Sequence, residues 1–311
     1  MSKKIRIGTR DSELALWQAR HVQDQLEALG FETELVSVKS TGDLVLDKPL
    51  YEMGITGIFT KTLDVAMINN EVDIAVHSMK DVPTRLPRGI VQAAVLKRAP
   101  VDDILVYNPV ENLEDRLKSA ENTLATGSLR RKAQWLHRYP KHNFTDLRGN
   151  VNTRLKKLAE SNWTGAIFAK AGLERINLIP DNHIELNWMI PAPAQGAMVI
   201  AAMENDAYCR DACAKLNHHY TEIATTIERD FLNELEGGCT APIGALARIK
   251  DQKLHFTAAL FSLDGKQKIG IDKTVDLNKN HNFGRLCATE VLENGGKKLM
   301  AKIKKVLDTH T

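Results

Sequence analysis

Asp73-Ile74-Ala75-Val76-His77-Ser78-Met79-Lys80-Asp81-Val82-Pro83 is the stretch that decides how this chain folds. An apolar run typical of a buried strand ends at Ser78, and a polar string follows at once. Ligands of open α/β sheets bind just beyond the carboxyl ends of strands. The stretch therefore predicts a buried strand with Lys80 and Asp81 at a binding edge. A turn carboxylate beside a solvated lysine fits the same residues about equally well.

Strand and helix patterns alternate on both sides of this stretch, over the first two thirds of the chain. Such alternation is typical of mostly parallel sheets with helices on both faces. The pattern changes after about residue 236, where strands at 243–249, 254–261 and 268–275 precede one helix at 283–307. The last part is therefore predicted as a small α+β domain with a three-stranded antiparallel sheet.

Composition indicates an ordinary globular protein of several domains, with 311 residues, 43% hydrophobic and 26% charged. A net charge of +3 and an aromatic content of 5% argue against a nucleic-acid partner. The N-terminus shows no signal peptide, and no apolar run reaches the ~20 residues that span a bilayer. We expect a cytoplasmic protein without a membrane partner. The four cysteines form no CxxC pair, so no metal site is expected.

Arginines recur where predicted strands give way to helices. They are Arg10, Arg130, Arg131, Arg148, Arg154 and Arg175. A guanidinium binds a carboxylate or phosphate through paired donors, and helix N-termini add N–H groups. Each arginine alone fits a surface charge, but the set predicts an anion site. No GxxxxGK[ST] or GxGxxG motif is present, so small organic acids or a polycarboxylate fit better than nucleotides.

A cysteine follows two glycines in Leu235-Glu236-Gly237-Gly238-Cys239. Nothing on the glycines covers its sulfur, so the thiol is expected to be accessible. An accessible thiol serves as a nucleophile, a redox group or an attachment point.

Together these motifs resemble the porphobilinogen deaminase (hydroxymethylbilane synthase) family. The matching segments, in order, are Arg10-Asp11-Ser12, His77–Pro83, Gly127-Ser128-Leu129-Arg130-Arg131, Leu147–Leu155, Ala171-Gly172-Leu173 with Arg175, Pro193–Ala197 and Leu235–Cys239. The resemblance implies two doubly wound α/β domains similar to periplasmic binding proteins, followed by the small α+β domain. It implies domains at residues 1–98 with 195–217, at 99–194 and at 218–311, in a monomer.

The resemblance also implies a transferase of tetrapyrrole and heme biosynthesis. Four porphobilinogen molecules would be joined head to tail, with loss of ammonia, to give hydroxymethylbilane. A dipyrromethane cofactor, the primer, would be held on Cys239 through a thioether, and Asp81 would be catalytic by stabilising positive charge and moving protons. The residues implied for the carboxylate arms of cofactor and substrate are Arg10, Ser12, Lys80, Ser128, Arg130, Arg131, Arg148, Arg154 and Arg175.

The sequence departs from the family pattern in two segments. The lid motif keeps Gly54, Gly57 and Phe59, but Glu52 and Thr56 replace its two lysines. Ala201 stands where the family has a glutamate, and Glu204 is the candidate to replace it.

Two other functions fit parts of the sequence. A non-enzymatic organic-anion-binding module would use the same arginines, but it gives no reason for Gly-Gly-Cys or the last domain. A cysteine-nucleophile hydrolase needs a base near its thiol, and His77 is the one histidine candidate.

Overall fold

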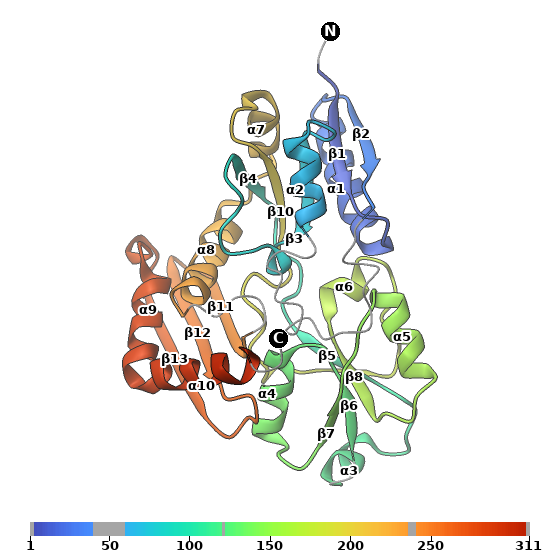
Figure 1. Cartoon of the computed structure of the whole chain (residues 1–311), viewed down its shortest axis with the longest axis vertical. Helices are drawn as coiled ribbons and strands as arrows, with labels where there is room; N and C mark the ends of the chain where they lie inside the picture. Colours follow the sequence, from blue (N-terminus) through green and yellow to red (C-terminus); the bar gives the residue numbers. More distant parts are fainter. Residues whose placement is uncertain (1–2, 40–59, 120–121, 236–240, 309–311) are drawn as a thin grey trace. The chain divides into compact units, whose positions relative to one another are not determined.

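The computed structural model describes residues 3–39, 60–119, 122–235 and 241–308, which divide into two units (Figure 1). The first unit holds described residues 3–39, 60–99 and 194–225. The second holds described residues 100–119, 122–193, 226–235 and 241–308. Within the described ranges, every helix is too short or too polar to cross a membrane.

The first unit is built on a five-stranded sheet. Its spatial order is β2 (Thr33–Ser37), β1 (Ile5–Thr9), β3 (Ile74–Ser78), β10 (Met198–Met203) and β4 (Ile90–Val95). β2, β1 and β3 run parallel, whereas β10 runs antiparallel to both of its neighbours. Helices α1 (Glu13–Ala28) and α7 (Ala207–Ala214) pack on one face, and α2 (Lys61–Ile68) packs on the other.

The second unit contains a sheet with the same pattern of directions. Its spatial order is β7 (Asn143–Thr145), β6 (Thr123–Ala125), β8 (Gly165–Ala169), β5 (Asp103–Tyr107) and β9 (His183–Glu185). β7, β6 and β8 run parallel, and β5 runs antiparallel between β8 and β9. Its helices are α3 (Leu113–Lys118), α4 (Leu129–Arg138), α5 (Val151–Ala159) and α6 (Lys170–Glu174).

A three-stranded antiparallel sheet completes the second unit. Its strands are β11 (Ile243–Lys250), β12 (Lys253–Phe261) and β13 (Lys268–Asp276), and its helices are α9 (Phe283–Val291), α10 (Lys297–Asp308) and the end of α8 (His219–Glu234). Figure 1 shows α9, in red, beside β13. Phe256 of β12 contacts Phe231 of α8 and Phe283 of α9 edge to face, so apolar contact holds these helices on the sheet.

Helix α4 joins the two sheets of the second unit. Ala133 on α4 packs with Ala259 and Phe261 of β12, and His137 Nδ1 hydrogen-bonds the Gly265 carbonyl at 2.7 Å. Gly265 has φ +72°, and a Cβ there would lie 2.6 Å from the Ala133 carbonyl oxygen. Only glycine therefore lets the β12–β13 turn approach this helix so closely.

The predicted class is confirmed: two α/β sheets are followed by a small α+β part with three antiparallel strands. Four of the five strands in each α/β sheet run in one direction, in line with the predicted mostly parallel sheets, but the prediction did not include β10 and β5, which each insert antiparallel to their neighbours. The single helix predicted at 283–307 is also interrupted. Gly295, with φ +103°, breaks it between α9 and α10, in a segment of non-helical backbone.

Candidate functional site

Two predicted site residues follow β1 in the first unit. Arg10 comes directly after the strand, and Ser12 occupies the N-cap position of α1 in an extended conformation. The Ser12 side chain makes no cap hydrogen bond. Its hydroxyl is therefore not committed to the helix end and is available to a ligand.

Lys80 and Asp81 follow β3 at the same edge, because β1 and β3 are parallel. They form a short 3-10 turn, Met79–Asp81, which is held by the Met79 N–H on the Ala197 carbonyl at 3.0 Å. Both side chains are half-buried. The structure thus places a carboxylate and an ammonium side by side at the carboxyl edge of the sheet, as predicted.

Gln195 is a residue of this edge that the sequence did not single out. Its side chain is buried, and its Oε1 accepts from Lys80 Nζ at 3.2 Å. Its carbonyl accepts from Arg98 Nε at 2.9 Å. Gln195 precedes β10, and only the antiparallel direction of that strand brings it beside Lys80. It therefore helps to hold the Lys80 ammonium at this edge.

His77 lies on β3 just before this turn and is buried. Burial, together with the positive charge of Arg10, lowers the pKa of His77 to about 4. In the described part of the chain, its Nε2 has no hydrogen-bond partner. His77 is therefore a neutral imidazole near Arg10 at neutral pH.

The second unit collects its predicted residues at a corresponding edge, where β6, β7 and β8 end. Ser128 is the N-cap of α4, and its hydroxyl accepts from the Arg131 backbone N–H at 3.4 Å. Arg148 follows β7, and Arg154 Nε donates to the Gly149 carbonyl at 2.7 Å. Arg175 ends α6 after β8 and is buried.

Burial of these cations changes their acidity. It lowers the pKa of Arg175 to about 10, with Glu174 opposing the shift, and it lowers the pKa of Arg148, with Asp146 opposing. Removing a positive charge from water is unfavourable unless an anion faces it. The edge is therefore suited to bind carboxylates.

Arg130 and Arg131 are both held by Asp103, which the sequence analysis missed. Arg130 Nη1 lies 2.7 Å from Asp103 Oδ2, and Arg131 Nη2 lies 2.8 Å from Asp103 Oδ1. Asp103 is fully buried at the start of β5. Because β5 is antiparallel to β8, Asp103 pairs with Ala169 at the carboxyl end of that strand. A parallel β5 would place this carboxylate at the opposite edge.

The structure thus gathers four predicted residues at one edge of the first unit and six at one edge of the second. That the two groups share one cleft stays a prediction. The lid residues Gly54, Gly57 and Phe59, the changed positions Glu52 and Thr56, and Cys239 all lie outside the described residues.

The second departure from the family pattern lies inside the first unit. Ala201 is a buried residue of β10, in an apolar cluster with Leu63 and Ala75. An ionised glutamate would be costly among these neighbours. Glu204 lies beyond the end of β10 and is exposed, so it does not replace a buried carboxylate at position 201.

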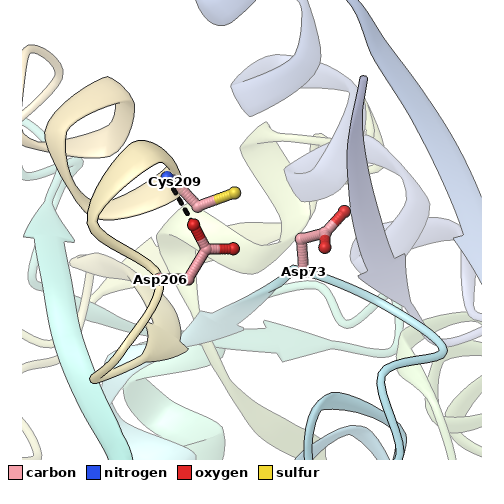
Figure 2. A group of neighbouring side chains, drawn as sticks. All are labelled: Asp73, Asp206 and Cys209. Atoms are coloured by element: carbon pink, nitrogen blue, oxygen red, sulfur yellow. Dashed lines mark hydrogen bonds between the residues drawn. The ribbon is translucent and has the colours of Figure 1, made fainter. Parts of the chain in front are cut away.

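A cluster of ligand-type side chains, Asp73, Asp206 and Cys209, lies at the other end of the first sheet (Figure 2). Lys3 Nζ is 3.1 Å from Asp73 Oδ1, 2.6 Å from Asp206 Oδ2 and 3.7 Å from Cys209 Sγ. Burial raises the pKa of the Cys209 thiol to about 12, so it stays protonated at neutral pH. The ammonium of Lys3 already supplies the positive charge that a metal ion would bring.

Two family models match the chain. Residues 5–211 match "Porphobilinogen deaminase, dipyromethane cofactor binding domain", and residues 223–293 match "Porphobilinogen deaminase, C-terminal domain". The second match covers the part of the chain that an anion-binding module would leave unexplained. The alternative of a non-enzymatic module is therefore not favoured.

Similar proteins agree over nearly the whole chain. Porphobilinogen deaminase of Nitratiruptor sp. is 40% identical, over 96% of this chain and 96% of the relative. Porphobilinogen deaminase of Desulforamulus reducens is 39% identical, over 98% of this chain and 99% of the relative. Solved structures are more distant. The methionine binding protein MetQ matches with TM-score 0.44 at 12% identity, over 68% of this chain and 89% of its own. The "probable amino-acid ABC transporter extracellular-binding protein ytmK" of Bacillus subtilis matches with TM-score 0.41 at 12% identity, over 75% of this chain and 97% of its own.

Proposed function

Because this chain belongs to the porphobilinogen deaminase family, we propose that Asp81 is its catalytic carboxylate and that Cys239 carries its primer. The protein is a transferase of tetrapyrrole synthesis that condenses four porphobilinogen molecules into hydroxymethylbilane with release of ammonia, on a dipyrromethane cofactor. The roles of individual residues in that reaction are proposals.

The placement of Asp81 is the observation that carries the proposal. It lies half-buried at the carboxyl edge of the first sheet, beside a lysine whose ammonium is held by Gln195. A carboxylate placed at this edge stabilises positive charge that develops on a pyrrole during loss of ammonia. It also accepts and returns the proton that the reaction moves. A preorganised charge of this kind is worth on the order of 10²–10³ in rate.

The arginine edge of the second unit fits a dipyrromethane, which carries acetate and propionate arms. The edge offers buried guanidinium groups on Arg130, Arg131, Arg148 and Arg175, and one carboxylate, Asp103, lies between the first two. Asp146 acts on Arg148 and Glu174 on Arg175, so these four guanidinium groups exceed the three carboxylates near them. When bound, the cofactor supplies a nucleophilic pyrrole carbon on which the product grows. We assign Arg10, Ser12, Lys80, Ser128, Arg130, Arg131, Arg148, Arg154 and Arg175 to the arms.

Elimination among the cysteines supports attachment at Cys239. The other three, Cys209, Cys213 and Cys287, are buried. Burial raises their thiol pKa values to about 12, 12 and 11. A thiol must ionise to attack an electrophilic carbon, so these three are poor anchors.

The remaining proposals concern organisation. We assign domain boundaries at residues 1–98 with 195–217, 99–194 and 218–311, and a lid that includes Gly54, Gly57 and Phe59. We further propose a cytoplasmic monomer that binds neither nucleic acid nor membrane. The net charge of +3 supports the absence of a nucleic-acid partner.

Intact mass and turnover of variants test the proposal. The purified wild-type chain should be heavier than its sequence by one dipyrromethane, and Cys239→Ala should lose that mass. Asp81→Ala should keep the mass but lose turnover by about 10²-fold or more. Asp24→Ala, which removes an exposed carboxylate from α1, is the matched control and should behave as wild type. Near-normal turnover in Asp81→Ala would contradict the catalytic assignment.

A further inference from the structure

A single buried carboxylate, Asp103, bridges the two neighbouring arginines at the N-terminus of α4. Arg131 contacts Asp103 Oδ1 through Nε at 3.0 Å and through Nη2 at 2.8 Å, and its Nη1 donates to the Ile167 carbonyl at 2.8 Å. Arg130 donates from Nη1 alone, to Asp103 at 2.7 Å and to the Ile190 carbonyl at 2.8 Å. Both guanidinium groups are therefore fixed from the protein side.

The charges in this arrangement do not balance. Two guanidinium groups face one carboxylate, and the three side chains are 5%, 8% and 0% exposed. Buried charges in folded proteins are normally paired, so one positive charge is left for an anion from outside the chain.

The unused donors belong to Arg130. Its Nε and Nη2 groups have no hydrogen-bond acceptor among the described residues. Among the described residues, His77 Nε2 is the one side-chain nitrogen or oxygen that is fully buried without a hydrogen-bond partner. The unbonded Arg130 groups do not belong to this class, so they are partly exposed. Three N–H groups in the plane of a guanidinium match the oxygens of a ligand carboxylate.

We propose that Asp103 is a positioning residue, which holds Arg130 and Arg131 so that the remaining donors of Arg130 bind one carboxylate arm of the primer. The proposal rests on the proposed function, because it takes the primer as the ligand. Asp103 acts through the two arginines and does not touch the reacting atoms. Asp103 is the first residue of β5, and it lies at the site because β5 runs antiparallel to β8.

Three variants test this role. In Asp103→Asn, the amide oxygen can accept from one guanidinium, but its NH₂ group faces the other. Asp103→Glu keeps the charge and lengthens the side chain by one methylene. Asp102→Asn is the matched control, since it removes the same charge one position earlier, from a half-buried side chain outside the pairs with Arg130 and Arg131.

The readouts are circular dichroism for folding, intact mass for the primed fraction, and KM and kcat for porphobilinogen. We expect folded Asp103→Asn to carry about one-tenth of the wild-type primed fraction or less, or to show KM raised about tenfold with a smaller change in kcat. Asp103→Glu should restore at least about half of the primed fraction, with KM still raised. Asp102→Asn should stay within about twofold of wild type.

Full priming and an unchanged KM in folded Asp103→Asn would overturn the proposal. If Asp103→Asn does not fold, Asp103→Glu decides: a raised KM supports positioning, and wild-type KM with full priming refutes it. Loss of the primer from the wild type itself would instead refute the proposed function.

Discussion

Substituting Gly265 by alanine should loosen the second unit, because this glycine lets the β12–β13 turn touch helix α4. The new Cβ would lie 2.6 Å from the Ala133 carbonyl oxygen and 2.6 Å from the His137 backbone nitrogen. Both are backbone atoms, which cannot rotate away. Relieving the overlap costs about 1–3 kcal/mol, and losing the hydrogen bond from His137 to Gly265 costs about 1 kcal/mol more.

A second effect has to be separated from this one. Gly265 has φ +72°, where a side chain is strained by roughly 1–2 kcal/mol whatever the space around it. Gly295→Ala is the matched control, because Gly295 also has positive φ, at +103°, and its Cβ would meet only Ile269 Cδ1, at 3.7 Å. The excess loss in Gly265→Ala over Gly295→Ala should be about 2–4 kcal/mol.

Urea unfolding followed by tryptophan fluorescence measures this difference. Three of the four tryptophans, Trp135, Trp163 and Trp188, lie in the second unit. Because α4 carries Arg130 and Arg131, the same variant should also raise the KM for porphobilinogen. Equal unfolding midpoints in the two variants would refute the close approach of turn and helix.

Three further predictions concern the rest of the chain. Between pH 6.5 and about 4, His77 binds a proton in the unfolded chain but not in the folded one. The contribution of neutral His77 to the free energy of unfolding is therefore complete above pH 6.5 and is lost as the pH falls, by at most about 3 kcal/mol. Thermal unfolding from pH 7.5 to 4.5 should therefore depend less on pH in His77→Gln, and parallel curves would contradict the burial of a neutral imidazole. Asp73→Asn should lower the free energy of unfolding by about 3 kcal/mol, because this buried carboxylate holds Arg6 and Lys3. Lys3→Ala should lower it by about 1 kcal/mol or less, because the Lys3 side chain is 45% exposed. Equal losses in urea unfolding would refute this ranking. Native primed protein treated with iodoacetamide at pH 8 should gain no adduct, since Cys209, Cys213 and Cys287 are buried with raised pKa values and Cys239 is already substituted. An adduct on Cys239, found by peptide mass spectrometry, would contradict the attachment.

The sequence predicted best what local patterns encode. The apolar run before Ser78 predicts the buried strand β3 from neighbouring residues alone. The strand ends that precede Arg148 and Asp81 were likewise predicted from the local sequence. These features depend on neighbours in sequence, which is why a single chain sufficed to find them.

Asp103 and Gln195 were missed for one shared reason. Each stands at the amino end of a strand, where no site is expected in a parallel sheet. Antiparallel pairing of β5 with β8 and of β10 with β3 brings them to the carboxyl edge. Strand direction is set by contacts between residues far apart in the chain, and no local pattern reports it.

The two antiparallel strands also matter to anyone who would engineer this protein. Each begins a few residues after the chain passes from one unit to the other, at Ala99-Pro100 and at Pro193-Ala194. An insertion at either passage would lie within a few residues of Asp103 or Gln195 and would disturb the position of that residue at the site. The hairpin at Asp251-Gln252, with both residues exposed and at positive φ, is instead the place where a tag or a fused domain should leave the carboxylate-binding edges intact.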